Sequence, residues 1–519
     1  MPAAQVIDLS GLYVAPGFID SHLHLEGLHL LPQAYAGAFL THGTTTIVTD
    51  LHEIANAGGL EGMIWYMDLL EQLPVDVFIM APSCVPSCPF ERGGGVLGLR
   101  ELRRLRDMPR VIGLGEVMDV SGVQKRDRSL MRKIGLFSGK PIDGHAPQLR
   151  GPHLHQYMSA GICSDHETTD LEEAEEKLTA GMHLFLRMGS ASKDLKRLTP
   201  LIGPHVLPLL SLCTDDLSTA DLANHGHMDS VIRYLVDRGV SILDAMKMAT
   251  VNASSYFCLV DRAHLGLGKK ADLTIFDGPK KMQIKMVIKN GRIAYREGDS
   301  LWPAEPTACA KAPSTESRIA DFALSDLAQP AKGDKIHVIA SEEGTLATGH
   351  LVESARVKDG ILACDPDDGL CFAYAFDRYG ADRRFGFGFV RGFSIHSGAI
   401  GTTYTHDSHN MLIVGDNAVD VFEVLQCLKR EGGGMAASRE GRIEAFIPMP
   451  YYGIISDLSG PEFLRRETSL RESINKMGTY QDNPMFRLSF LSLPVIPDLR
   501  LTVNGLFDVA EERHIEASE

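Results

Sequence analysis

The stretch GFIDSHLHLEG, residues 17–27, gathers several side chains that can bind a metal or carry a proton. It is an alternating apolar run that contains Asp20, His22, His24 and Glu26. In an extended strand, residues two positions apart project from the same face, so His22 and His24 can chelate one ion. Paired histidines at this spacing are more often hydrogen-bonded core or surface residues, and the pair alone is therefore a weak indication of a metal site.

Further candidate ligands follow later in the chain, each at the end of a short apolar run. They are Glu116, His145, His166 and Asp215. Four neutral imidazoles and two carboxylates can hold two divalent ions, with Glu116 as the bridge. Such a pair of ions lowers the pKa of bound water, and Asp215 could then move a proton from the nucleophile to the leaving group. The pattern predicts a hydrolase with a two-metal centre.

The runs that carry these residues predict the fold. From residue 16 to residue 258, short β-branched apolar runs alternate with polar tips and amphipathic helical stretches. The runs are GFIDSHLH, TTTIVTD, VDVFIMAPS, RVIGLGEVM, KPIDGHAP, MSAGICSDHE, GMHLFLRMGS and HVLPLLSLCTDD. Alternating strands and helices indicate a parallel sheet, and eight units in roughly 250 residues indicate a closed (β/α)₈ barrel of the TIM type. In such a barrel the chemistry lies at the carboxyl ends of the strands, where these polar tips fall.

The other regions differ from the barrel. Residues 1–15 and 259–300 contain short alternating strands and an Asn290–Gly291 turn, which together predict one small β subdomain. Residues 301–334 are rich in Pro, Ala, Ser and charges, as is typical of a linker or a peripheral helix. Residues 335–519 mix strands such as HNMLIVG with helices such as AVDVFEVLQCLKREGGG, so we expect an α/β C-terminal domain there.

The composition argues against some partners. Lys and Arg number 51 and Asp and Glu 67, and the resulting net charge of -16 repels a phosphate backbone, so no nucleic-acid polymer is expected. No segment reaches the length of about twenty uncharged apolar residues that spans a bilayer. The N-terminal MPAAQVIDLSG lacks the features of a secretory signal. We expect a soluble cytoplasmic protein with no membrane partner.

Seven segments resemble, in order and spacing, the motifs of the adenine deaminases of the amidohydrolase superfamily. They are PGFIDSHLHLEG, GTTTIVTDLHEIANAGG, GLGEVMDVSGV, IDGHAPQLRG, GICSDHETTDLEEA, LRMGSASKDL and CTDDLSTADLANHGHMD. The later THDSHNMLIVG and REGGG resemble that family's C-terminal domain. The resemblance implies hydrolytic deamination of adenine to hypoxanthine and ammonia in purine salvage. It also implies two divalent ions, manganese or iron(II) with zinc as a further option, a free purine base and water as partners, and a homo-oligomer, with a dimer expected.

The resemblance assigns the metal ligands residue by residue. One ion takes His22, His24 and Asp215, the other takes His145 and His166, and Glu116 lies between them. Metal-activated hydroxide would attack C6 of the purine ring, and a protonated carboxyl group or a histidine must then face N1.

Several other polar residues are candidates for catalysis or substrate binding. Glu26 shares the predicted strand face of the paired histidines, so it could orient a ligand or contact N1 or water; otherwise it is a surface carboxylate. His52 and Glu53 follow the second strand and could read purine edges, although Glu53 could instead cap the next helix. Asp216 could hold a substrate N–H or cap a helix. Glu167 could orient His166 or begin a helix.

Arg187 and Ser190 lie in RMGSASK, which is similar to the family's REGSAAR-like motif and is expected to contact substrate. This chain departs from the family at Met188, where Glu is usual, at Leu217, where Arg is common, and at Gly27, where Ser is usual. These departures leave an N6-substituted adenine, another aminopurine or a cyclic amide open as the substrate. A catalytically inactive ligand-binding homologue is a second alternative, although six intact ligands argue against it.

The segment HDSHN contains a separate group, His406, Asp407 and His409. It could close the barrel mouth over the base, form an inter-domain hydrogen-bond cluster or hold an extra metal. The small β subdomain is expected to be short on its N-terminal side, because the chain begins with barely one of its strands.

Overall fold

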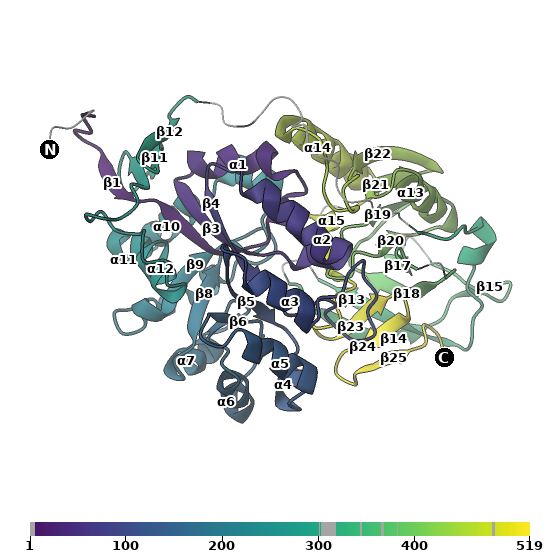
Figure 1. Cartoon of the computed structure of the whole chain (residues 1–519). Helices are drawn as coiled ribbons and strands as arrows, with labels where there is room; N and C mark the ends of the chain where they lie inside the picture. The colour runs from purple at the N-terminus through teal and green to yellow at the C-terminus, as the bar shows by residue number, and fades with distance from the viewer. Residues whose placement is uncertain are drawn as a thin grey trace.

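The computed structural model describes residues 6–299, 302, 318–342, 345–364, 368–380, 382–479 and 483–519. Residues 301 and 303–317 of the predicted linker, 301–334, therefore lie outside the described residues, as do residues 1–5 and 300 of the predicted small subdomain. Figure 1 shows the first half of the chain as a barrel with the second half packed beside it. Within the described part of the chain, no helix is both long and apolar enough to cross a membrane.

Eight parallel strands form the barrel, one from each of the eight apolar runs. They are β2 (Phe18–Leu23), β3 (Thr44–Asp50), β4 (Asp76–Ala81), β5 (Val111–Val117), β6 (Ile142–Gly144), β7 (Ser164–Asp165), β8 (His183–Arg187) and β9 (Leu210–Cys213). Pairing runs in chain order from β2 to β6 and from β7 to β9. Backbone hydrogen bonds close the ring, from Cys163 to Ile142 at 3.1 Å and from Asp215 to His22 at 2.8 Å. The predicted (β/α)₈ fold is confirmed.

The barrel strands are buried, and several are rich in apolar or β-branched residues, because both faces of a barrel strand are covered. Every residue of β3, TTTIVTD, is buried, and so is every residue of β9, LSLC. The helices between and after the strands are α1 (Pro32–Thr41), α2 (His52–Leu70), α3 (Leu99–Arg106), α4 (Val120–Gln124), α5 (Arg128–Leu136), α6 (Gly151–Ser159), α7 (Leu171–Thr179), α8 (Leu195–Leu198), α9 (Thr219–His225), α10 (Met228–Asp237), α11 (Ile242–Met248) and α12 (Val251–Tyr256).

A small antiparallel sheet joins both ends of the barrel segment. Its order is β1 (Tyr13–Pro16), β10 (Leu273–Phe276), β11 (Ile284–Lys289) and β12 (Arg292–Arg296). The β11–β12 turn places Asn290 at φ 50° and Gly291 at φ 75°, and two successive positive values are what a tight hairpin of this kind requires. The boundaries of the subdomain stay a prediction.

The second half of the chain is built on a mixed sheet of eight strands. Its order is β14 (Thr348–Ser354), β13 (Lys335–Ser341), β18 (Phe385–Arg391), β17 (Leu370–Phe376), β20 (Met411–Gly415), β19 (Gly398–Thr402), β21 (Gly434–Arg439) and β22 (Arg442–Pro448). Helix α13 (Ala418–Arg430) begins at an Asn417 cap and turns Val421, Val424 and Leu428 inward at helical spacing. The remaining elements are α14 (Gly460–Lys476), α15 (Pro484–Phe490), a hairpin of β15 (Val357–Lys358) and β16 (Ile361–Leu362), and a sheet of β23 (Leu499–Thr502), β24 (Gly505–Asp508) and β25 (Arg513–Ile515).

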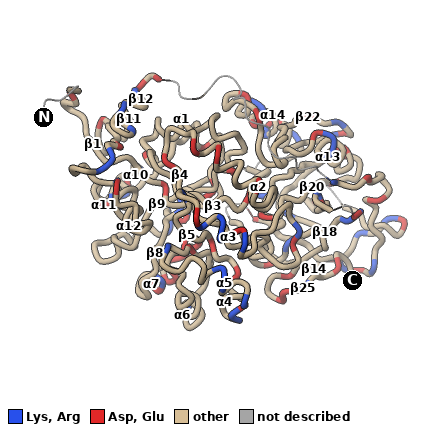
Figure 2. Tube along the Cα trace, in the orientation of Figure 1, with Lys and Arg blue, Asp and Glu red and all other residues tan. Residues whose placement is uncertain are grey.

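The two halves share one hydrophobic core. A continuous cluster of buried residues includes barrel side chains such as Leu28 and Tyr66 and also Tyr404, Met449 and Ile454 of the second half. Acidic and basic residues occur in both halves along the chain (Figure 2). The shared core fixes the second half against the barrel, which matters because its loops reach the site described next.

Candidate active site

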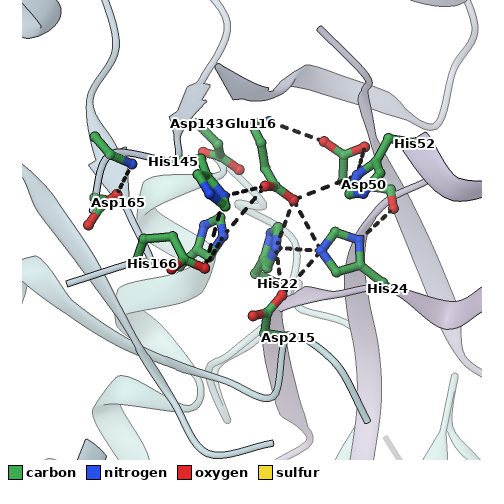
Figure 3. Close-up of polar contacts among 12 residues, drawn as sticks. His22, His24, Asp50, His52, Glu116, Asp143, His145, Asp165, His166 and Asp215 are labelled. Atoms are coloured by element: carbon green, nitrogen blue, oxygen red, sulfur yellow. Dashed lines mark hydrogen bonds and ion pairs between the residues drawn. The ribbon is translucent and has the colours of Figure 1, made fainter. Parts of the chain in front are cut away.

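The predicted metal ligands converge at the carboxyl end of the barrel, as Figure 3 shows. Each follows or ends a different strand, apart from His22 and His24, which belong to the end of β2. None of the six residues is more than 6% exposed. They are His22, His24, Glu116, His145, His166 and Asp215.

Glu116 lies at the centre of this group. Its Oε1 is 3.1 Å from His24 Nε2 and 3.3 Å from His22 Nε2. Its Oε2 is 2.8 Å from His145 Nδ1 and 3.6 Å from His166 Nε2. Each carboxylate oxygen thus faces two imidazoles, which is the arrangement expected of a group that bridges two ions.

Asp215 is turned toward the cluster by its backbone. It follows β9 with φ 61°, a left-handed conformation that Asp tolerates better than most residues. Its Oδ1 lies 3.1 Å from His24 Nε2 and 3.4 Å from His22 Nε2. Arg187 donates a 3.0 Å hydrogen bond to the other oxygen, Oδ2. The carboxylate therefore has one oxygen fixed by Arg187 and one directed at the paired histidines.

The pKa shifts of the clustered side chains indicate that the cluster stabilises positive charge at its centre. Burial lowers the pKa of His22, but Asp215 and Glu116 overcome this and raise it to about 10. Burial likewise opposes ionisation of Glu116 and Asp215, yet the surrounding histidines hold the pKa of both carboxyl groups well below the ordinary range. The Nε2 atoms of His22 and His24 lie only 3.1 Å apart and face the same oxygens. Imidazole and carboxylate donors in this arrangement fit divalent manganese, iron or zinc.

Two aspartates hold the ligands from behind. Asp50, at the end of β3, accepts a 3.1 Å hydrogen bond from the backbone N–H of Glu116, and its carbonyl lies 3.1 Å from His24 Nδ1. Asp20 accepts from the backbone N–H of His22 at 3.2 Å and faces His227 Nε2 at 2.9 Å. Asp20 thus orients the site without reaching its centre. The sequence reasoning missed Asp50, whose signal was an acid at the tip of an apolar run.

The expectation that Glu26 continues the strand face of His22 and His24 is wrong. Strand β2 ends at Leu23, and Glu26 lies in a 3₁₀ turn, Leu25–Leu28, to which strand alternation does not apply. Its Oε1 accepts a 3.1 Å hydrogen bond from the backbone N–H of Ile54. Glu26 is not among the residues that line the cavity described below.

His52 and Glu53, at the start of α2, are brought beside residues from the second half of the chain. His52 Nδ1 lies 3.7 Å from Glu116 Oε1, so its ring borders the metal-ligand cluster. Glu53 instead pairs with His406 Nδ1 and, at 2.6 Å, with His409 Nε2. Tyr404 also donates a 3.3 Å hydrogen bond to Glu53. The HDSHN segment therefore closes the barrel mouth through an inter-domain hydrogen-bond cluster.

Arg187 and Ser190 hold the site together and do not border the cavity. Arg187 pairs with Glu167 and with Asp194, at 2.7 Å, in addition to Asp215. Ser190 donates to Asp221 and accepts a 2.8 Å hydrogen bond from the backbone N–H of Ser218, at the start of α9.

Asp216 and Glu167 do border the cavity. Burial and the neighbouring Asp215 raise the pKa of Asp216 to about 6, and its Oδ1 has no hydrogen-bond partner in the part of the chain that the structure describes. Burial also raises the pKa of Glu167, although Arg187 opposes the shift.

A small cavity lies beside the ligand cluster at the barrel mouth. The barrel supplies one wall. The other wall comes from the second half of the chain, and its residues are Leu346, His406, Asp407, Phe490, Leu493 and Ile496. Sequence reasoning missed the four apolar members of this wall, since no motif or spacing marks them. A wider adjoining pocket shares Glu167, Leu346 and Ile496 with this cavity.

The departures from the family motifs lie away from the cavity. Met188, Leu217 and Gly27 are absent from the described residues that line it. Leu217 is 3% exposed and belongs to the hydrophobic core. A Cβ atom on Gly27 would lie 3.6 Å from the Tyr404 hydroxyl and 3.8 Å from Asp216 Oδ1, both ordinary contacts. The substitutions at these three positions therefore do not change the residues that line the cavity.

Family models and sequence relatives agree with this geometry. Residues 13–294 match the amidohydrolase family, and residues 345–513 match the adenine deaminase C-terminal domain. "Adenine deaminase 2" of Carboxydothermus hydrogenoformans is 35% identical over 504 residues, which cover 97% of this chain and 88% of the relative. "Adenine deaminase" of Syntrophobacter fumaroxidans is 37% identical over 508 residues, 98% of this chain and 88% of the relative.

Solved structures are more distant. A crystal structure described as an adenine deaminase aligns with a TM-score of 0.40 and 18% identity, over 55% of this chain and 88% of that chain. At that distance the alignment carries no argument. The family models and the near full-length relatives do carry one, and by them the chain belongs to the adenine deaminase family of the metal-dependent amidohydrolases.

Proposed function

We propose that this protein hydrolyses adenine to hypoxanthine and ammonia. The observation that carries the proposal is Glu116, with two imidazoles against each carboxylate oxygen, in the floor of a small buried cavity beside Asp215. The near full-length relatives named as adenine deaminases support the choice of substrate. Purine salvage in the cytoplasm and a homodimer belong to the same proposal.

The six clustered side chains would hold two divalent ions, manganese or iron(II), with zinc as a third candidate. His22, His24 and Asp215 would hold one ion, His145 and His166 the other, and Glu116 both. Bound there, the ions would supply a hydroxide nucleophile at neutral pH.

We assign the proton transfers to side chains of the protein. Asp215 would take the proton of the attacking water. Two contacts support this role: one of its oxygens faces the cluster, and Arg187 holds the other. The same carboxyl group would pass that proton to the departing amine, so that adenine and water give hypoxanthine and ammonia.

Attack at C6 places negative charge on N1, which requires a hydrogen-bond donor. Asp216 is our candidate because it borders the cavity, is 4% exposed and has an oxygen without a partner. Glu167 also borders the cavity, but Arg187 occupies both of its oxygens. Glu26 is not among the residues that line the cavity, and its Oε1 accepts from the backbone N–H of Ile54.

The test is to express the protein with added manganese and to offer adenine, N6-methyladenine, 2,6-diaminopurine and a cyclic amide such as hydantoin. We expect adenine to give stoichiometric ammonia and hypoxanthine, and chelation to abolish turnover until metal is restored. Preference for another compound in the panel would replace adenine as substrate. No turnover of any compound by protein that binds two equivalents of metal would favour the inactive homologue and contradict the proposal.

A further inference from the structure

The loop between β19 and β20 sends two polar side chains of the second half of the chain into the active-site cavity. His406 is 3% exposed and Asp407 is 1% exposed, and both line the cavity together with the metal-ligand cluster. The proposed reaction at C6 uses neither of them. Their position raises the question of which part of the substrate they meet.

Glu53 fixes His406 in place. Its Oε1 accepts from His406 Nδ1 and Tyr404, and its Oε2 faces His409 Nε2 at 2.6 Å. The ring of His406 stacks on Phe490, with centroids 3.9 Å apart and planes at 22°. These contacts restrain the His406 ring at Nδ1 and across one face, and with it the loop that carries the neighbouring Asp407.

Asp407 differs from Glu53 because no described residue gives either of its oxygens a hydrogen bond. The nearest cationic atoms are His52 Nε2 at 3.8 Å and His406 Nδ1 at 3.9 Å, both too far for hydrogen bonds. A buried carboxyl group of this kind costs free energy unless something donates to it. The cavity that it borders is where such a donor can come from.

The ring of His52 lies between Asp407 and the metal-ligand cluster, and its contacts give the position of Asp407 relative to the reaction centre. His52 Nδ1 is 3.7 Å from Glu116 Oε1, and the opposite nitrogen, Nε2, is 3.8 Å from Asp407 Oδ1. Asp407 thus lies about one ring beyond the carboxylate beside which C6 must react. In adenine, the ring fused beyond the reacting pyrimidine is the imidazole ring, and it carries the only ring N–H of the neutral base.

We propose that Asp407 is a specificity-determining residue that accepts a hydrogen bond from the imidazole-ring N–H of the purine, with Glu53 as the positioning residue behind it. This inference rests on the proposed function. It predicts a preference for free bases, because a purine substituted at N9 with a group such as a methyl has no N–H to offer there.

A cation is the competing occupant, since His52, Glu53, His406 and Asp407 have ligand atoms within 4.8 Å of one another. The existing contacts argue against it. Both oxygens of Glu53 already face imidazole nitrogens at hydrogen-bond or ion-pair distance, so a cation would have to displace them. Metal analysis decides between the two occupants.

The experiment compares adenine with 9-methyladenine on the manganese-loaded wild type and on Asp407→Leu, which keeps the branched shape but removes both oxygens. In the wild type we expect kcat/KM to be roughly 10- to 100-fold lower for 9-methyladenine, the loss of one hydrogen bond to a charged group. In Asp407→Leu, adenine should fall toward the 9-methyladenine value, so that the ratio approaches one. Ser408→Ala, in the same loop but outside the cavity lining, should keep the wild-type ratio.

Calorimetric binding of hypoxanthine and 9-methylhypoxanthine separates this inference from the proposed function, because it requires no turnover. If adenine is not deaminated but the wild type prefers hypoxanthine and Asp407→Leu does not, the proposed function fails and the inference stands. An unchanged preference in Asp407→Leu, or the absence of any preference or binding in the wild type, overturns the inference. Loss of a third equivalent of metal from Asp407→Leu would also overturn it and assign a cation to Asp407.

Discussion

The active-site cavity has two groups of histidines and carboxylates, and they are built differently. In the barrel group, nitrogens and oxygens lie 2.8–3.6 Å apart around Glu116, and each oxygen is shared by two rings. In the inter-domain group, Glu53 is surrounded by His406, His409 and Tyr404, while Asp407 has no hydrogen-bond partner among the described residues.

This difference suits the barrel group to binding cations and the inter-domain group to binding a neutral ligand. Shared oxygens and crowded imidazoles demand positive charge that the side chains cannot supply by hydrogen bonds alone. A single bare carboxyl group in a fixed position needs only one donor. The variants below are chosen to break one group while leaving the other intact.

The largest effect is expected from Glu116→Ala. Removing the bridge should lower metal content by at least one equivalent per chain and reduce turnover of adenine by roughly 10⁴-fold or more, since nucleophile activation depends on both ions. Metal content by mass spectrometry and ammonia release measure the two effects. Asp407→Leu, with its full metal content, is the matched control. Retention of two equivalents by Glu116→Ala would show that Glu116 is not the bridge.

Asp215→Asn should come next. Asn keeps the size and the contact with Arg187 but cannot carry a proton, so we expect kcat to fall roughly 10²–10⁴-fold while part of the metal remains bound. Initial rates at saturating adenine, normalised to bound metal, measure the change. Turnover within a few-fold of the wild type would remove Asp215 from the proton-transfer role.

Glu53→Gln tests the inter-domain group through its anchor. A neutral amide cannot accept from both His406 and His409, so Asp407 should lose its fixed position. We expect KM for adenine to rise about tenfold with kcat changed less than threefold and metal content unchanged. We also expect a lower melting temperature, because a buried hydrogen bond to a charged group contributes about 1.5–3 kcal/mol. Equal falls in kcat and metal content would instead place Glu53 with the barrel group.

The smallest effect concerns Glu91, in the barrel loop beside the inter-domain segment. Burial raises the pKa of Glu91 from 4.5 to about 7, although a hydrogen bond from Ser408 opposes the shift. Between these values the folded protein keeps a proton that the unfolded chain has lost, so the free energy of unfolding falls as pH rises.

Glu91→Gln should remove that part of the pH dependence, which is of the order of 1–3 kcal/mol. Relative to the wild type, the variant should gain more melting temperature at pH 8 than at pH 5.5, measured at constant metal. An equal gain at both pH values would contradict the assignment.

The sequence by itself determined the barrel and its metal-ligand cluster. Parallel strands must be buried on both faces, so they appear as apolar runs, and their carboxyl ends meet at one edge. The sequence alone therefore predicts that polar residues at the strand ends, such as Glu116 and Asp215, lie close together. The prediction failed for Glu26 because a strand rule was extended past Leu23, where the backbone turns into a 3₁₀ helix.

Only the tertiary structure decided what closes the cavity. Phe490, Leu493 and Ile496 follow no periodicity that sets them apart from core residues. They form a small cluster with Phe486, and the neighbouring Leu488 and Leu491 belong to the hydrophobic core that the two halves share. The sequence showed that His406 and Asp407 were unusual. It did not show that Glu53 pairs with His406 and His409 while Asp407 has no hydrogen-bond partner among the described residues. Those contacts join residues more than three hundred positions apart.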